Sequence, residues 1–215
     1  MKENLHTYRK SYEKHQLLEE EIKKDPFGLF LDWLKEVEVT REVEEVNTMT
    51  VSTIGLDGFP KSRIVLLKEY DQQGFVFYTN YFSEKGKAIA ENPKVCLSFF
   101  WPRSERQIII KGIAKKTSEE ESSVYFHSRP RGSQLGAWAS EQSKVVPSRE
   151  FLEERLKALE EEYKDKPIPK PPHWGGYKVF PTEFEFWQGR PNRLHDRIYY
   201  SKENDTDWKI DRLAP

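Results

Sequence analysis

The sequence has a single cysteine, and this scarcity excludes several classes of site. Among 215 residues only Cys96 is a cysteine, so the chain can form neither an internal disulfide nor a cysteine-based metal site. The five histidines show no HExxH motif and no paired spacing of metal ligands, so we expect no metal site. Cys96 lies in an apolar run, residues 95–100, which is typical of a buried structural thiol.

Phosphate-binding glycine loops and an excess of charge of one sign are also lacking. Neither GxGxxG nor GxxxxGK[ST] occurs, so a bound phosphate must be held by side chains and strand ends. The 35 basic and 36 acidic residues leave a formal net charge of −1, which argues against a dedicated nucleic-acid-binding protein. The GxSxG motif of serine hydrolases is absent as well.

Long hydrophobic runs are missing too. No run approaches the length that crosses a bilayer, and the N-terminal residues have no apolar signal core. Charged residues make up 33% of the chain, which indicates a heavily solvated surface. From these observations we expect a cytoplasmic protein.

What the sequence does have is a series of short strand patterns interrupted by helices. The helix signals include an Asp25-Pro26 start and a capping box of Thr117 with Glu120. Strands that follow one another in hairpin order, interrupted by helices, predict an α+β fold built on an antiparallel barrel or a strongly coiled sheet. The first three strands are expected to form an antiparallel meander. The strands are expected at 49–54, 62–68, 75–80, 94–101, 106–115, 176–187, 194–201 and 207–213.

The chain is expected to comprise two parts. Residues 1–24 are polar and predict a mobile or helical N-terminal segment. Residues 25–215 are long enough for one domain with a sizeable core.

A stretch near the C-terminus is the strongest candidate for a binding site. Aromatic residues at 184–187 precede a Gly-Arg-Pro break, after which Arg193, His195 and Arg197 crowd together. A flat aromatic ring beside dense positive charge suits a planar, anionic ligand, although the stretch taken alone is better explained by an edge strand with a solvated charged end. Polar residues in otherwise apolar strands could complete a phosphate site: Arg63, Lys68 and Gln107.

At these positions the sequence resembles the pyridoxamine (pyridoxine) 5′-phosphate oxidase family. The resemblance runs from about Arg9 to Pro215 and rests on many motifs in the same order. They are RIVLLK at 63–68, FYTN at 77–80, YFHSRPR at 125–131, SQxGAW at 133–138, QS at 142–143, WGG at 174–176, EFWQ-x4-RLHDR at 185–197 and the terminal RLAP.

This resemblance implies an FMN-binding split β-barrel with surrounding helices, working as a homodimer with FMN at the subunit interface. The implied reaction converts pyridoxamine or pyridoxine 5′-phosphate to pyridoxal 5′-phosphate, with reduction of dioxygen to hydrogen peroxide. Two alternatives on the same barrel stay open: a flavin reductase, and a non-catalytic protein that binds flavin or pyridoxal phosphate. A second phosphate clamp at Arg129 and Ser133 disfavours the reductase.

The resemblance also implies roles for the residues that match the family's motifs. FMN is expected to contact Arg63, Val65, Leu66, Lys68, Tyr78, Thr79, Lys85, Gln107, Gln142, Ser143, Trp187 and Arg197. The substrate is expected to contact Arg9, Tyr12, Lys68, Tyr125, Arg129, Ser133, Arg193 and His195, of which the last two are the catalytic candidates. Glu84 stands where the family commonly has arginine; because a carboxylate repels phosphate, we expect its side chain to point away from FMN.

Overall fold

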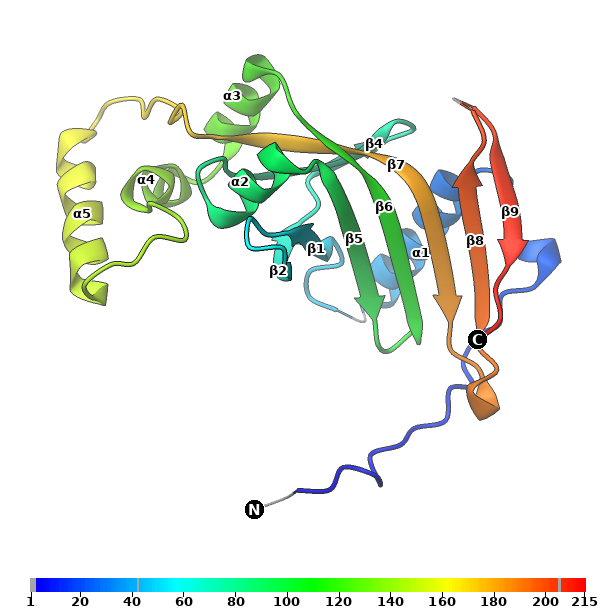
Figure 1. Ribbon diagram of the computed structural model, residues 1–215. Coiled ribbons are helices and arrows are strands. Elements are labelled where there is room, and N and C mark those ends of the chain that lie inside the picture. Colours follow the sequence, from blue (N-terminus) through cyan, green and yellow to red (C-terminus); the bar gives the residue numbers. More distant parts are fainter. Residues whose placement is uncertain (1–2, 42, 205) are drawn as a thin grey trace. The chain divides into compact units, whose positions relative to one another are not determined.

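The computed structural model describes residues 3–41, 43–204 and 206–215, and these form an α+β protein (Figure 1). Its sheet has the strand order β2-β1-β5-β6-β7-β4-β3, and β8 and β9 continue from β7. The strands are β1 (Thr48–Ile54), β2 (Pro60–Leu66), β3 (Glu69–Asp71), β4 (Gly74–Asn80), β5 (Lys94–Trp101), β6 (Arg106–Lys116), β7 (Trp174–Gln188), β8 (Asp196–Lys202) and β9 (Trp208–Arg212). The helices are α1 (Pro26–Thr40), α2 (Glu84–Glu91), α3 (Glu119–Ser128), α4 (Arg131–Ala139) and α5 (Arg149–Glu162), with short 3₁₀ helices η1 (Glu19–Glu21) and η2 (Pro191–Arg193).

The chain divides into two compact units. The first unit consists of residues up to 50 together with 97–111 and 181–215, and the second of 51–96 and 112–180. The boundary expected between residues 24 and 25 stays a prediction. No helix within the described ranges is both long and apolar enough to cross a membrane.

The core of the first unit forms between α1 and the C-terminal half of β7. Asp25 caps α1 by accepting hydrogen bonds from the backbone N–H groups of Phe27 and Gly28, at 3.1 and 3.2 Å, as its sequence predicts. Phe27 and Trp33 then pack edge-on against Phe184 and Phe186, with ring centroids 5.3 and 5.2 Å apart. Because strand side chains alternate, burying these two phenylalanines turns Trp187 to the opposite face of β7.

The second unit has its own core around α3 and α4. One cluster of this core contains the buried residues Phe126, Leu135, Ile168 and Trp174. The predicted capping box is wrong by one position: Ser118 and Glu121 form it, and α3 begins at Glu119. Thr117 is otherwise engaged, because its N–H donates to the carbonyl of Gly176 and its hydroxyl hydrogen-bonds with Ser122.

The predicted meander is also wrong in its third strand. β1 and β2 pair as expected, but β4 pairs with β3 on one edge and with β7 on the other. The backbone N–H of Lys68, just beyond β2, donates to the carbonyl of Val76 in β4 at 2.9 Å, but β2 and β4 are not neighbours in the strand order. The short strand β3, which the sequence pattern did not separate from the loop, forms the hairpin with β4 through the turn at Asp71–Gly74.

We predict that Gly86→Ala destabilises α2. A Cβ at Gly86 would lie 2.2 Å from the backbone oxygen of Tyr81, and this backbone cannot yield cheaply. Overpacking of this kind costs about 1–3 kcal/mol, measured as a loss in the free energy of unfolding. Gly132→Ala in α4 is the matched control, since nothing lies within 4 Å of its Cβ; equal losses in the two variants would contradict the account.

Candidate active site

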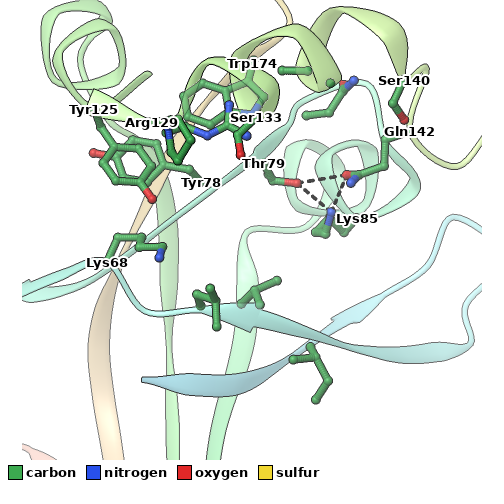
Figure 2. Close-up of a pocket in the computed structure, with 17 residues that line it drawn as sticks. Lys68, Tyr78, Thr79, Lys85, Tyr125, Arg129, Ser133, Ser140, Gln142 and Trp174 are labelled. Atoms are coloured by element: carbon green, nitrogen blue, oxygen red, sulfur yellow. Dashed lines mark hydrogen bonds between the residues drawn. The ribbon is translucent and has the colours of Figure 1, made fainter. Parts of the chain in front are cut away.

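The second unit contains a cavity of about 590 Å³, shown in Figure 2. Ten of the predicted site residues line it: Val65, Leu66, Lys68, Tyr78, Thr79, Lys85, Tyr125, Arg129, Ser133 and Gln142. They come from β2, β4, α2, α3, α4 and the segments next to them. Residues more than 70 positions apart in the sequence therefore share one surface.

Lys85 forms one wall of the cavity. Ser83 caps α2 by accepting a hydrogen bond from the N–H of Gly86, which places Lys85 in the first turn of the helix. Its Nζ donates to Thr79 Oγ1 and to Gln142 Oε1, both at 2.6 Å, in the triangle of hydrogen bonds in Figure 2. Burial, with a smaller contribution from Arg63, lowers the pKa of Lys85 to about 8.

The opposite wall is a stack of aromatic rings. Tyr78 lies 3.9 Å from Tyr125 and 5.4 Å from Trp174, measured between ring centroids. The guanidinium of Arg129 lies 4.6 Å from the Trp174 centroid, a cation–π contact that orients the charged group. Figure 2 shows Arg129 beside this stack.

Arg129 has a donor that the described residues leave unused. Its Nη1 is buried and makes no hydrogen bond with any described residue. Burial lowers the pKa of Arg129, but a guanidinium remains charged at neutral pH. A buried, charged donor without a partner is costly, so this atom calls for an anionic ligand.

The electrostatics of the cavity favour such a ligand. Lys68, Lys85 and Arg129 line it, and no carboxylate is found among the described residues of the lining. Ser133 lies in the first turn of α4, where the helix dipole adds partial positive charge. The cavity therefore combines a cationic interior with flat aromatic walls, which suits phosphorylated ring compounds.

Three residues near the cavity lie outside its lining. Arg63 Nη1 donates to Thr53 Oγ1 at 2.7 Å and to the carbonyl of Lys61. Ser143 is exposed and has a positive φ of 72°. Glu84 pairs with Lys61 at 2.5 Å and does not line the cavity; that it points away from FMN stays a prediction.

The sequence reasoning missed several lining residues. The seven lining residues that were not predicted lie within or close to the sequence motifs of the family. Their position beside these motifs could have identified them as lining residues. They are Ile64, Asn80, Pro130, Gly136, Ala137, Ser140 and Trp174.

The other predicted residues lie in the first unit. Trp187 and Arg197 are partners across β7 and β8, so their side chains share one face of the sheet. Arg197 Nε donates to Glu185 Oε1 at 2.8 Å, and this bond raises the pKa of Arg197. Gln107 lies half-buried on β6.

His195 and Arg193 follow the turn after β7. His195 Nδ1 accepts a hydrogen bond from the backbone N–H of Arg190 at 3.0 Å, so the proton of a neutral ring lies on Nε2. Burial, and then the charge of Arg193, lower the pKa of His195. Asn192 and Arg193 both have positive φ, 56° and 62°; consecutive non-glycine residues in this region are strained, and such strain is concentrated at functional sites.

Tyr12 joins this group. Its ring packs against Trp187 at 5.7 Å and lies 5.9 Å from His195, between centroids. Arg9 is exposed. The predicted residues are thus found in two groups, a cavity group in the second unit and a Trp187–His195 group in the first.

Comparison with known proteins identifies the family to which the chain belongs. Residues 36–163 match the model described as pyridoxamine 5′-phosphate oxidase. Residues 174–215 match the model described as the pyridoxine 5′-phosphate oxidase C-terminal dimerisation region. Among similar curated proteins are two named pyridoxine/pyridoxamine 5′-phosphate oxidase. That of Flavobacterium johnsoniae is 64% identical over 98% of this chain and 99% of its own, and that of Christiangramia forsetii is 57% identical over the whole of both chains.

Solved structures agree on the fold. PhzG from Burkholderia lata, in complex with tetrahydrophenazine-1-carboxylic acid, is 29% identical with a TM-score of 0.85 and covers 93% of this chain and 98% of its own. A pyridoxamine 5′-phosphate oxidase-related, FMN-binding protein from Nostoc punctiforme has a TM-score of 0.69 at 13% identity, covering 90% of this chain and all of its own. The predicted α+β split β-barrel fold is confirmed. With both family models and full-length relatives in agreement, the chain belongs to the pyridoxamine 5′-phosphate oxidase family.

Proposed function

We propose that this protein is an FMN-dependent oxidase that converts pyridoxamine 5′-phosphate or pyridoxine 5′-phosphate to pyridoxal 5′-phosphate. The observation that carries the proposal is the cavity with three cations, no carboxylate among its described lining residues, and a stacked aromatic wall. For the amine, the balanced reaction consumes dioxygen and water and yields the aldehyde, ammonia and hydrogen peroxide. The alcohol yields the aldehyde and hydrogen peroxide.

FMN fits the residues on the Lys85 side of the cavity. Lys85 and Thr79 offer a buried ammonium and a hydroxyl to a phosphate, and Gln142 adds an amide. When bound, FMN supplies the hydride acceptor and the route of electrons to dioxygen. The remaining cofactor contacts in this proposal are Arg63, Val65, Leu66, Lys68, Tyr78, Gln107, Ser143, Trp187 and Arg197.

The substrate phosphate fits the Arg129 side. Arg129 Nη1 is buried without a partner among the described residues, and a phosphate oxygen would satisfy it with a charge-assisted hydrogen bond. Ser133, Tyr125 and Lys68 line the same cavity and complete the proposed clamp. A second phosphate clamp is what distinguishes this oxidase from the alternative flavin reductase.

His195 and Arg193 are proposed to orient the substrate ring and to stabilise its charge. Burial and Arg193 lower the pKa of His195, so its ring is neutral at pH 7 and presents an N–H at Nε2. Arg193 is exposed on a strained turn and carries a fixed positive charge. Arg9 and Tyr12 belong to the same proposed substrate group.

A homodimer with FMN at its interface completes the proposal. The C-terminal region matches a model described as a dimerisation region. In the second unit, Leu56, Phe59, Ile64 and Phe82 are exposed by 66–73%, and large exposed apolar side chains of this kind are what a subunit interface would cover. Ile64 also lines the cavity, so a partner that covers β2 would lie next to the ligand. The cytoplasmic location stays a prediction.

Aerobic turnover tests the proposed function directly. The purified protein should be yellow, take up oxygen and release peroxide with pyridoxamine or pyridoxine 5′-phosphate. The vitamers without phosphate should be poor substrates, because the Arg129 clamp then has no anion to bind. A yellow protein without turnover contradicts the oxidase and leaves the flavin reductase and the non-catalytic alternative, and a colourless protein that takes up no FMN contradicts every flavin-based function.

Arg193→Leu should lower turnover with little effect on FMN content. The substitution removes a positive charge proposed to face the substrate, and loss of such a charge-assisted contact costs about 1.5–3 kcal/mol, roughly 10- to 150-fold in kcat/KM. Arg149→Leu on the exposed surface of α5 is the control. Unchanged oxidation of pyridoxine 5′-phosphate by the Arg193 variant would reject the assignment.

FMN affinity should fall as the pH rises above about 8. Lys85 has a pKa of about 8 without the ligand, and a bound phosphate raises it, so above pH 8 binding must take up a proton. The affinity then declines by up to about tenfold per pH unit until the pKa of the complex is reached. Flavin fluorescence titrations from pH 7 to 10 measure this. Lys85→Met should bind weakly and lose the dependence, whereas Lys87→Met, exposed on the same helix, should retain it.

A further inference from the structure

An N-terminal strap, defined as residues 10–17, is tied to the first unit by side chains of other segments. In Figure 1 this segment, in blue, runs beside the turn that contains η2. Glu105 holds its middle, and Asp196 holds its end by accepting a hydrogen bond from the N–H of Leu17 at 3.1 Å. Arg212 Nη2 donates to the carbonyl of Leu17 at 2.9 Å, so the end of the strap is held on both sides.

Glu105 is built into the turn before β6 as a fixed anchor. Its side chain is 1% exposed, and its φ of 57° is unusual for a residue other than glycine. Its carbonyl accepts a hydrogen bond from the N–H of Gly189 at 2.7 Å and another from Gln188 Nε2 at 3.3 Å. The backbone of Glu105 is therefore held by the end of β7, which aims the carboxylate at the strap.

The carboxylate holds the strap by two hydrogen bonds and one ion pair. Glu105 Oε2 accepts hydrogen bonds from the N–H groups of Glu13 and Lys14, at 2.9 and 3.2 Å, and Lys10 Nζ lies 2.9 Å from Oε1. Burial opposes ionisation, but these donors outweigh it and lower the pKa of Glu105. One ionised group thus fastens the strap on both sides of Tyr12.

Tyr12 is held against the substrate group as a result. Its ring contacts Trp187 and His195, and it lies directly on the backbone at Gly189, where an added Cβ would come within 2.8 Å of Tyr12 Cβ. The strap is largely polar and exposed elsewhere, so little other packing fixes this ring. The position of Tyr12 therefore depends on the bonds that flank it.

We propose that Glu105 is a positioning residue that fastens the strap and so keeps Tyr12 over the Trp187–His195 pair for substrate binding. This inference rests on the proposed function, in which Tyr12 and His195 contact the substrate. Glu105 acts through Tyr12, since the described partners of its carboxylate all belong to the strap. Loss of the carboxylate frees residues 10–14, whereas Arg190 still holds His15 and Gln16, and Asp196 and Arg212 still hold Leu17.

Glu105→Ala should raise KM for pyridoxamine 5′-phosphate by about tenfold, the loss expected when hydrogen bonds to a charged group disappear. FMN affinity should change by less than about twofold, because the carboxylate contacts no proposed cofactor residue. Amide hydrogen exchange at Glu13 and Lys14 should accelerate by at least about tenfold. Glu105→Gln keeps one acceptor oxygen and should give intermediate values.

A double-mutant cycle separates positioning from a general structural effect. In a Tyr12→Ala background, Glu105→Ala should raise KM no further, because the two changes remove the same contact. Tyr12→Phe keeps the ring and should preserve the effect of Glu105→Ala. A further rise in KM when Glu105→Ala is added to Tyr12→Ala, or an unchanged KM in Glu105→Ala alone, would overturn the proposal.

Amide hydrogen exchange distinguishes a failure of this proposal from a failure of the proposed function. It measures whether Glu105 holds the strap in place, and it needs no catalytic turnover. A wild-type protein that oxidises neither phosphorylated vitamer refutes the oxidase function and with it the substrate role of Tyr12. Protection at Glu13 and Lys14 that is equal in wild type and Glu105→Ala refutes the fastening itself, whatever the activity.

Discussion

The site depends on positively charged side chains that are buried beside the cavity. Among the described residues that line this cavity, none is a carboxylate that could neutralise them. Lys85 is 8% exposed, and Arg129 has a buried donor that no described residue satisfies. Placing such groups in a protein is costly unless an anion compensates them. The structure around them is arranged to hold them in place rather than to neutralise them.

Local features of the second unit produce this arrangement. Ser83 caps α2, and Gly86 allows the helix to approach the backbone at Tyr81, which fixes Lys85 next to Thr79. On the other side, α3 ends at Ser128 and α4 begins at Arg131, so the break places Arg129 over Trp174. Lys170 donates to the backbone carbonyl of Trp174 at 2.9 Å and so holds the backbone at that residue.

The sequence predicted local features well and long-range ones poorly. The cap of α1 at Asp25 and most strand positions could be read from short patterns, and ten lining residues of the cavity followed from the family resemblance. The partners of β4 could not, because Tyr78 pairs with Gly176 almost a hundred residues away, and no local period encodes that choice. The fastening of the strap by Glu105 was missed for the same reason, since it joins residues 91 and 92 positions apart.

Anaerobic reduction of the bound flavin tests the central claim most directly, namely that the buried cations select a phosphorylated ring substrate. The holoprotein is mixed without oxygen with pyridoxamine 5′-phosphate or with pyridoxamine, and the visible absorbance of the oxidised flavin is followed. The account predicts rapid, saturable bleaching by the phosphorylated compound alone, and a shift to much higher concentrations in Arg129→Leu. Equal bleaching by both compounds, or unaltered saturation in Arg129→Leu, would contradict it.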